Sequence, residues 1–268
     1  MFSTELLGNP VAVVLEAEGL TSEQMQGLAR WTNLSETAFV LAPTVPGADY
    51  RVRIFTPAQE LPFAGHPTLG TCHAWARGSA ATEAVQQCGA GLVPLRRTAD
   101  GWAFAAPPLV RSGPVGPADL DIITGILGIG RQDLVDAQWV DNGPGWVAVL
   151  LPNVDSLMAL RPGFLQGYFV GAAALHNPGG PADLEVRAFF DVGGKTVEDP
   201  VTGSLNASLA PWLTGAGHLA YPYVAEQGTV IGRRGFVQLD QDEAGTVWVG
   251  GATVTRVSGV LDLAASPH

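Results

Sequence analysis

The chain has 268 residues, 47% of them hydrophobic and 15% charged, which is enough apolar material for one large packed domain or two of medium size. Its 25 acidic and 14 basic residues give a formal net charge of −11, which repels nucleic acid phosphates and anionic membrane surfaces. Intrinsic disorder and nucleic-acid binding are therefore not expected. Lys195 is the single lysine, so a Schiff base, including a pyridoxal phosphate linkage, would depend on it alone, and we expect no cofactor.

The N-terminal sequence MFSTELLGNP lacks the basic start and long apolar run of a signal peptide, and no stretch of about 18 apolar residues follows it. We expect a cytoplasmic protein with no membrane partner. Two cysteines, Cys72 and Cys88, are too few for a disulfide framework, and no Cys/His spacing fits a zinc site. We expect them to be reduced thiols that act as small apolar residues, and we expect no metal.

Short segments rich in Val, Ile, Phe and Ala recur between turn residues, which is typical of β-strands. In chain order they are VAVVLE, TAFVLAP, YRVRIFT, WAFAAP, WVAVLLP, YFVGAAA, LEVRAFF and VWVGGATVTRV. Helical patterns are fewer, and the pattern predicts an α+β fold. The five expected helices begin near Thr21, after Gly65, near Asp119, near Asp155 and after Gly203. A Pro/Gly-rich break, APPLVRSGPVGPADL, predicts a domain boundary near residue 112, giving domains 1–112 and 113–268.

The first helix carries its own start signals. Thr21 and Gln24 have the spacing of a capping box, and Leu20 and Met25 fall at the positions of a hydrophobic staple. The helix should end near Asn33. The following NLSE would then form the turn that leads into the next strand.

Glu36 ends that turn, in the segment RWTNLSETAFV. Since no arginine follows closely in sequence, burial rather than pairing would set its charge state. Burial would raise its pKa from about 4.3 toward neutrality, where acid/base catalysis is most effective. The alternative is a solvated turn glutamate or a hydrogen-bonding residue at the strand end.

Two segments of the chain look alike. VRIFTPAQELPFAGHPTLGTCHAW and VRAFFDVGGKTVEDPVTGSLNASLAPW each contain a Val-Arg strand, a glutamate, a glycine five positions later and a helical pattern. The glutamate and glycine are Glu60 and Gly65 in the first segment, and Glu198 and Gly203 in the second. We interpret this as a duplicated unit. Two such units facing each other would direct two helix N-termini at one site, where backbone N–H groups favour an anion such as a substrate carboxylate.

Three polar side chains flank these helix starts. His66 follows Gly65, where the helix dipole favours a neutral imidazole, and the alternative is an ordinary structural histidine. Asp199, four residues before Gly203, is typical of an Asp-Pro turn, or it orients His66 or holds a substrate donor. Ser204 is a common residue type at a helix start, and no G-x-S-x-G motif surrounds it, so a hydrolase nucleophile is not indicated.

The motifs GNPVAVV, NLSETAFV, VRIFTPAQELPFAGHPTLGT, EDPVTGSLNASLA and EQGTVIGRRG together resemble the phenazine-biosynthesis PhzF-like proteins, whose fold is that of diaminopimelate epimerase. The resemblance implies two similar domains related by a pseudo-twofold, each with a curved sheet around a central helix. It also implies an active-site cleft between them and a last strand that crosses back to the first domain. By motif, it places the acid/base glutamate at Glu36, with His66, Asp199 and Ser204 beside it, and Gly65 at the first helix start.

In the epimerase relatives, two cysteines occupy the positions held here by His66 and Ser204. Their replacement removes a two-thiol inversion, whereas one glutamate can still remove a proton and return it elsewhere on the same face. The resemblance therefore implies a cofactor-independent, PhzF-like isomerase acting on a small carboxylate, with the substrate left open. Two alternatives remain: an epimerase or racemase of an amino acid derivative, and a non-catalytic small-molecule or protein-binding module. The family also implies a homodimer.

Overall fold

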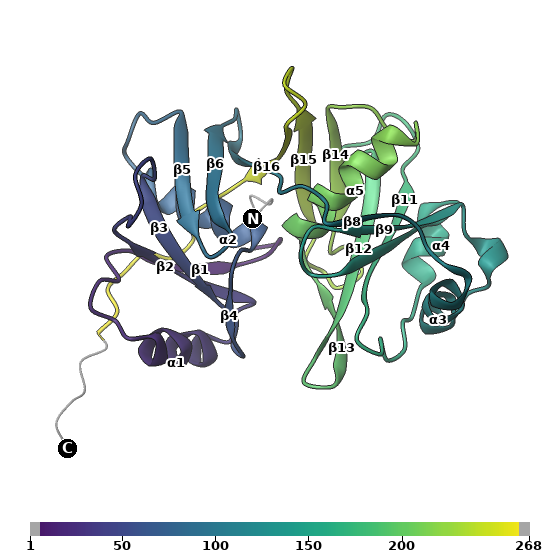
Figure 1. The fold of residues 1–268 in the computed structure, drawn as a ribbon, viewed down its shortest axis with the longest axis horizontal. Coiled ribbons are helices and arrows are strands. Elements are labelled where there is room, and N and C mark those ends of the chain that lie inside the picture. Colours follow the sequence, from purple (N-terminus) through teal and green to yellow (C-terminus); the bar gives the residue numbers. More distant parts are fainter. Residues whose placement is uncertain (1–5, 263–268) are drawn as a thin grey trace.

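The computed structural model describes residues 6–262, and its strands connect into one 16-stranded sheet that divides into two halves (Figure 1). The first half contains β1 (Val11–Val14), α1 (Ser22–Thr32), β2 (Glu36–Leu41), β3 (Tyr50–Phe55), β4 (Glu60–Leu61), α2 (Gly65–Trp75), β5 (Glu83–Cys88), β6 (Gly91–Arg97) and β7 (Gly101–Ala105).

The second half contains β10 (Trp146–Leu150), α4 (Val154–Ala159), β11 (Phe169–Leu175), β12 (Leu184–Val192), β13 (Lys195–Asp199), α5 (Gly203–Gly215), β14 (Tyr223–Gln227), β15 (Gly235–Gln241) and β16 (Val247–Ala252). Between the halves lie β8 (Arg111–Pro114), α3 (Pro117–Leu127), a short 3₁₀ helix (Arg131–Asp133) and β9 (Asp136–Asp141). Because β8 pairs with β9 and β9 with β10, this connecting segment extends the second half.

The two halves repeat one strand connectivity. In the first, β1–β2 and β3–β5 are parallel, while β2–β3, β3–β4, β5–β6 and β6–β7 are antiparallel. In the second, β10–β11 and β12–β14 are parallel, while β11–β12, β12–β13, β14–β15 and β15–β16 are antiparallel. The predicted α+β fold with two similar halves is confirmed, and the duplication extends well beyond the segments that revealed it.

The halves are joined by antiparallel pairing of β7 with β16. Ala103 is the register partner of Gly250, and a Cβ at Gly250 would lie 2.9 Å from the Ala103 Cβ, so the strands approach closely there. The last strand thus pairs with β15 on one side and with the first half on the other. The predicted boundary at residue 112 falls inside β8.

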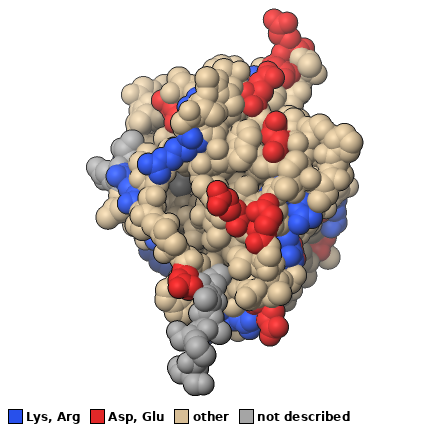
Figure 2. All heavy atoms as spheres, turned by 90° about the vertical axis from the view of Figure 1, so that its left-hand side faces the viewer, with Lys and Arg blue, Asp and Glu red and all other residues tan. Residues whose placement is uncertain are grey.

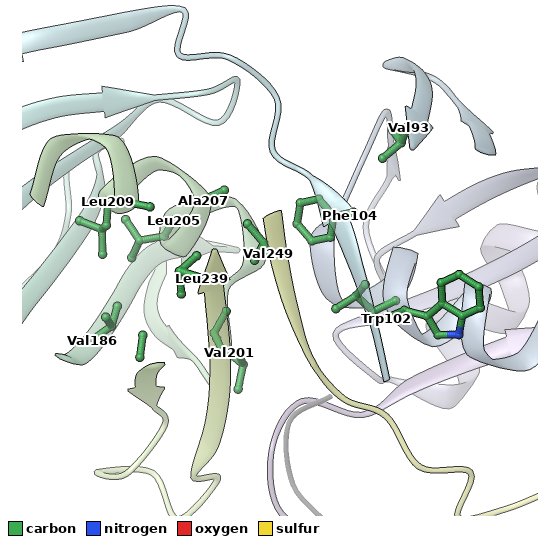
Figure 3. Packing of buried hydrophobic residues seen from close by; sticks show 14 of the residues in the cluster. Val93, Trp102, Phe104, Val186, Val201, Leu205, Ala207, Leu209, Leu239 and Val249 are labelled. Carbon is green, nitrogen blue, oxygen red and sulfur yellow. The ribbon is translucent and has the colours of Figure 1, made fainter. Parts of the chain in front are cut away.

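One hydrophobic core runs through both halves and surrounds the central helices α2 and α5. It includes Leu69 of α2. Figure 3 shows Leu205 and Leu209 of α5 in this core, with Phe104 and Val249 from the joining strands. Burial of each such side chain contributes about 1.5–3 kcal/mol. The core therefore holds the two helix starts in fixed positions at the junction.

The outer faces of the sheet are covered by the remaining helices. Along β10, Trp146, Ala148 and Leu150 belong to the central core, whereas Val147 and Val149 pack in a second cluster with α3 and α4. A strand that is covered on both faces has no polar positions, which explains the continuous apolar run WVAVLL. On the other half, α1 packs over β2 and β3.

All eight segments predicted as strands lie on strands, and the five predicted helices form. The Thr21 hydroxyl accepts a hydrogen bond from the Gln24 backbone N–H, the Gln24 side chain accepts from the Thr21 N–H, and the helix ends at Asn33 in the left-handed conformation. Cys72 is buried in the core, where desolvation raises its pKa to about 12, and neither cysteine forms a disulfide. None of the helices within residues 6–262 combines the length and apolarity needed to cross a bilayer.

Candidate active site

The N-termini of α2 and α5 meet at the junction of the two halves. A Cβ built on Gly65 would lie 2.8 Å from the Cα of Gly203, and the reverse contact is also 2.8 Å. No real side chain tolerates that approach, so both positions require glycine. The two helix N-termini are therefore in contact. Their first backbone N–H groups, which have no intrahelical partners, lie close together.

Glu36 lies at this junction as the first residue of β2, paired in register with Val11 of β1. Its side chain is 15% exposed, and its Oε2 lies 3.2 Å from His66 Nε2 on α2. The angles do not make this contact a hydrogen bond, and within residues 6–262 neither atom has a hydrogen-bond partner. A buried carboxyl and an imidazole thus face each other with an unused acceptor or donor on each.

Burial fixes the protonation states of this pair. Desolvation raises the pKa of Glu36 to about 8, with a further contribution from the nearby charge of Asp199. Desolvation also lowers the pKa of His66 to about 3. At neutral pH the glutamate is therefore mostly a neutral acid and the histidine a neutral imidazole. Burial, rather than the helix dipole expected from the sequence, is the main cause for His66.

Asp199 ends β13 and is held from both halves. Its Oδ1 accepts a hydrogen bond from Asn9 Nδ2 at 3.1 Å, and its Oδ2 accepts one from Thr202 Oγ1 at 2.5 Å. These bonds favour the charged form, but burial outweighs them and raises the pKa of Asp199 to about 6. Within residues 6–262 we find no hydrogen bond from Asp199 to His66, so the predicted orienting contact is replaced by those to Asn9 and Thr202.

Ser204 occupies the position on α5 that His66 occupies on α2. Its Oγ accepts a hydrogen bond from the Trp146 indole N–H at 3.0 Å, and its carbonyl oxygen accepts one from Asn142 Nδ2 at 3.0 Å. In the part of the chain that the structure describes, the Ser204 hydroxyl donates to no acceptor, so its proton is available for a ligand. The structure thus brings Glu36, His66, Asp199, Gly65, Gly203 and Ser204 together in one region.

The sequence analysis assigned no role to several residues that support the site. Gln227 donates to the Asp199 carbonyl oxygen and to Thr202 Oγ1, and it accepts from the Thr202 N–H. Gln227, Thr202 and Asn9 all lie in quoted motifs, EQGTVIGRRG, EDPVTGSLNASLA and GNPVAVV. The motifs were a usable signal, but spacing along the chain gave no indication of contacts between residues about 190 positions apart.

A second group of titratable side chains lies outside this region. His176, Glu185 and Glu226 place possible metal-ligand atoms within 4.8 Å of one another. Arg234 pairs with Glu226, and His176 Nε2 lies 3.1 Å from Glu185 Oε2, so these side chains already contact one another or Arg234. The absence of a metal stays a prediction. Lys195 is exposed at the β12–β13 turn.

Charge on the surface is mixed. On the face shown in Figure 2, basic side chains are scattered among acidic ones and form no continuous basic surface. The expectation that nucleic acid is not a partner, which was based on the net charge of −11, stays a prediction.

Comparison with known proteins gives one consistent match. The family described as phenazine biosynthesis-like protein (PhzC-PhzF) matches residues 2–259. A curated relative from Pseudomonas fluorescens, trans-2,3-dihydro-3-hydroxyanthranilate isomerase, is 34% identical over 86% of this chain and 84% of its own. A relative from Schizosaccharomyces pombe, Antisense-enhancing sequence 1, is 32% identical over 94% of this chain and 93% of its own.

A solved structure shows the same fold. The crystal structure of a phenazine biosynthesis protein of the PhzF family from Enterococcus faecalis superposes with a TM-score of 0.73 at 26% identity. The match covers 94% of this chain and 92% of that one. The similarity therefore includes both halves and the junction between them.

Proposed function

The chain belongs to the PhzC-PhzF family of phenazine biosynthesis-like proteins, and from this premise we propose that it is a cofactor-independent isomerase that moves a proton and a double bond on a small carboxylate. The observation that carries the proposal is the buried pair at the junction. Glu36, with a pKa raised to about 8, faces the unprotonated His66 at a distance of 3.2 Å.

In the proposed reaction, the ionised form of Glu36 removes a proton from a carbon next to a double bond. The C–H electron pair becomes the new double bond, and the pair of the old double bond takes up a proton at its far carbon. The acid proton of Glu36 exchanges with solvent, and Glu36 then delivers a proton to that carbon on the same face, so its charge is restored and no co-reactant is consumed. A pKa near the working pH suits a group that must act first as base and then as acid.

The other residues would hold the substrate. The first amides of α2 and α5, beside Gly65 and Gly203, favour the carboxylate of the substrate, and the Ser204 hydroxyl is available to donate to it. His66, as a neutral imidazole, and Asp199 would position the substrate or modulate proton transfer. Holding the reacting carbon against the acid in this way is itself a large part of catalysis.

Inversion of a stereocentre is less well supported. It needs one group on each face of a carbon, and the two-thiol arrangement is absent, because Gly65 and Gly203 are followed by His66 and Ser204 and because Cys72 is buried in the core. A binding module remains the other alternative.

The test begins with a thermal-shift screen of small carboxylates, including trans-2,3-dihydro-3-hydroxyanthranilate, the substrate in the name of the Pseudomonas relative. Each binder is then followed by NMR in deuterated water. The proposal predicts one deuteron incorporated per turnover together with a shifted double bond. Exchange with inversion of the starting compound would indicate an epimerase, and binding without exchange for every ligand would indicate a binding module.

A further inference from the structure

The N-terminal motif GNPV, residues 8–11, runs past all of the candidate acid/base residues. Asn9 binds Asp199, Pro10 is hydrogen-bonded by His66, and Val11 is the register partner of Glu36. We propose that residues 8–11 form a strap that positions these three side chains, with Asn9 as the positioning residue for Asp199. The inference rests on the proposed function, since it concerns the same site, and assigns a task to a motif that the reaction itself does not use.

The strap is anchored to the second half although it belongs to the first. Gly8 N–H donates to the Arg233 carbonyl oxygen at 3.1 Å, and Arg233 Nε donates to the Gly8 carbonyl oxygen at 3.1 Å. Arg233 lies in the turn between β14 and β15. The chain enters β1 at Val11, three residues after this anchor, so the strap spans the junction in a few residues.

Asn9 is fully buried and makes two contacts that an amide makes better than any other small side chain. Its Nδ2 donates to Asp199 Oδ1 and to the Val201 carbonyl oxygen, both at 3.1 Å. Both partners are acceptors, so the position needs two N–H donors in one group. An aspartate at this position would place another carboxylate beside Asp199 and would lose both bonds.

Pro10 determines which nitrogen of His66 carries the proton. Proline has no N–H, so the backbone group that bonds the ring is the carbonyl oxygen, and the imidazole must donate. Since His66 Nε2 has no hydrogen-bond partner within residues 6–262, the donor is Nδ1. The unprotonated Nε2 then lies 3.2 Å from Glu36 Oε2, close to the neutral acid although the angles do not make a hydrogen bond.

Few charged or titratable groups lie near Asp199 among the described residues. Glu36 of β2 is close enough to feel the charge of Asp199, His66 of α2 lies 3.2 Å from that glutamate, and Arg233 Nε donates to the Gly8 carbonyl oxygen. Thr202 supplies the remaining hydrogen bond. Loss of the Asn9 amide should therefore act directly on the ionisation of Asp199.

The test measures ionisation and needs no substrate. Carboxyl carbons are titrated by ¹³C NMR in the wild type, Asn9→Ala, Asn9→Ser and the control Asn153→Ala, and Asp199→Asn assigns the signal. Asn153 caps α4 through its Oδ1, so the control loses an asparagine of structural value far from the site.

A hydrogen bond to a charged group is worth enough to shift a pKa by about one unit. We expect the Asp199 pKa to rise by about one unit in Asn9→Ala, by less in Asn9→Ser, whose hydroxyl can donate once, and not at all in Asn153→Ala. An unchanged Asp199 pKa in folded Asn9→Ala, or in folded Asn9→Ser if the alanine variant does not fold, overturns the proposal.

A second measurement uses the unmodified protein. The ¹⁵N shifts of His66 at neutral pH should report the tautomer protonated at Nδ1, and a proton on Nε2 would overturn the role of Pro10. Both readouts are independent of turnover. If the Asp199 shift appears but no carboxylate is isomerised, the strap stands and the proposed function fails; if isomerisation is found without the shift, the strap alone fails.

Discussion

The two halves of the molecule share their framework and differ in their chemistry. Arg53 forms a two-bond ion pair with Glu60 and lies over the Phe55 ring in the first half. In the second half, Arg187 makes the same pair with Glu198 and lies over Phe189. Strand register then aligns the halves, and three of the positions that differ carry the candidate site: Glu36 and Phe169, Leu61 and Asp199, and His66 and Ser204.

These differences all fall at the candidate site. At the position of Glu36 the second half has Phe169, which packs against Trp146 and Phe190. At the position of Asp199 the first half has Leu61. The duplication therefore supplies the two helix starts and their close contact, whereas each half contributes a different acid. With Glu36 as the proposed base, the base lies on one half only, which suits a proton shift on a single face.

The largest expected effect concerns the acid that one half has and the other lacks. The pKa of Glu36 is raised in the folded protein from 4.5 to about 8, so the folded state retains a proton that the unfolded state releases between these values. The contribution of Glu36 to stability is therefore lost as pH rises through that window. Glu36→Gln should be more stable than the wild type by roughly 3 to 5 kcal/mol at pH 8 and should differ little below pH 4.5.

Denaturant unfolding at several pH values measures this difference. The exposed Glu23→Gln on α1 serves as the control and should show no such trend. A constant gap between Glu36→Gln and the wild type from pH 4 to 9 would contradict the assignment of a buried, protonated Glu36.

The helices and strands that the two halves share were easier to predict from the sequence than the site residues in which the halves differ. Capping of the first helix and the continuous apolar strands follow from local patterns, and the Glu-to-Gly spacing revealed the duplication. Glu36 lies outside the repeated segments, so its local pattern alone left it as a turn residue. The contact between Asn9 and Asp199 was not predictable from spacing, because it depends on how the two halves dock.

The next prediction concerns the arginine–glutamate ion pair that occurs in both halves. The Arg187–Glu198 side chains are 4% and 10% exposed, and Arg187 also donates to the Leu157 and Leu160 carbonyl oxygens. Removal of one partner leaves a buried charge, so Arg187→Met should lower the free energy of unfolding by about 3 to 5 kcal/mol.

The counterpart in the first half is a matched control. The side chains of Arg53 and Glu60 are 23% and 43% exposed, and Arg53→Met should cost about 0 to 1 kcal/mol. Chemical denaturation of both variants checks the contrast. Equal losses of unfolding free energy in Arg187→Met and Arg53→Met would mean that burial does not make the second ion pair more important than the first.

A smaller effect concerns the contact that the halves share. Gly65→Ala or Gly203→Ala would place a methyl group 2.8 Å from the opposite Cα, and we expect either to lower the free energy of unfolding by about 1 to 3 kcal/mol. At Gly215, at the other end of α5, an added Cβ would lie more than 4 Å from the side chains and backbone packed around the helix. Gly215→Ala should therefore be neutral or stabilising by up to about 1 kcal/mol. Thermal unfolding compares the three, and tolerance of alanine at both helix starts would show that they do not meet as described.

The central claim is that Glu36 is the acid/base that moves the proton. Its most direct test is the rate of solvent deuterium incorporation into an identified substrate, followed by NMR for the wild type, Glu36→Gln and Glu23→Gln. We expect Glu36→Gln to lose a factor of about 10² to 10⁴ while still binding the substrate, and Glu23→Gln to match the wild type. A near-wild-type rate of incorporation by folded Glu36→Gln would contradict the account.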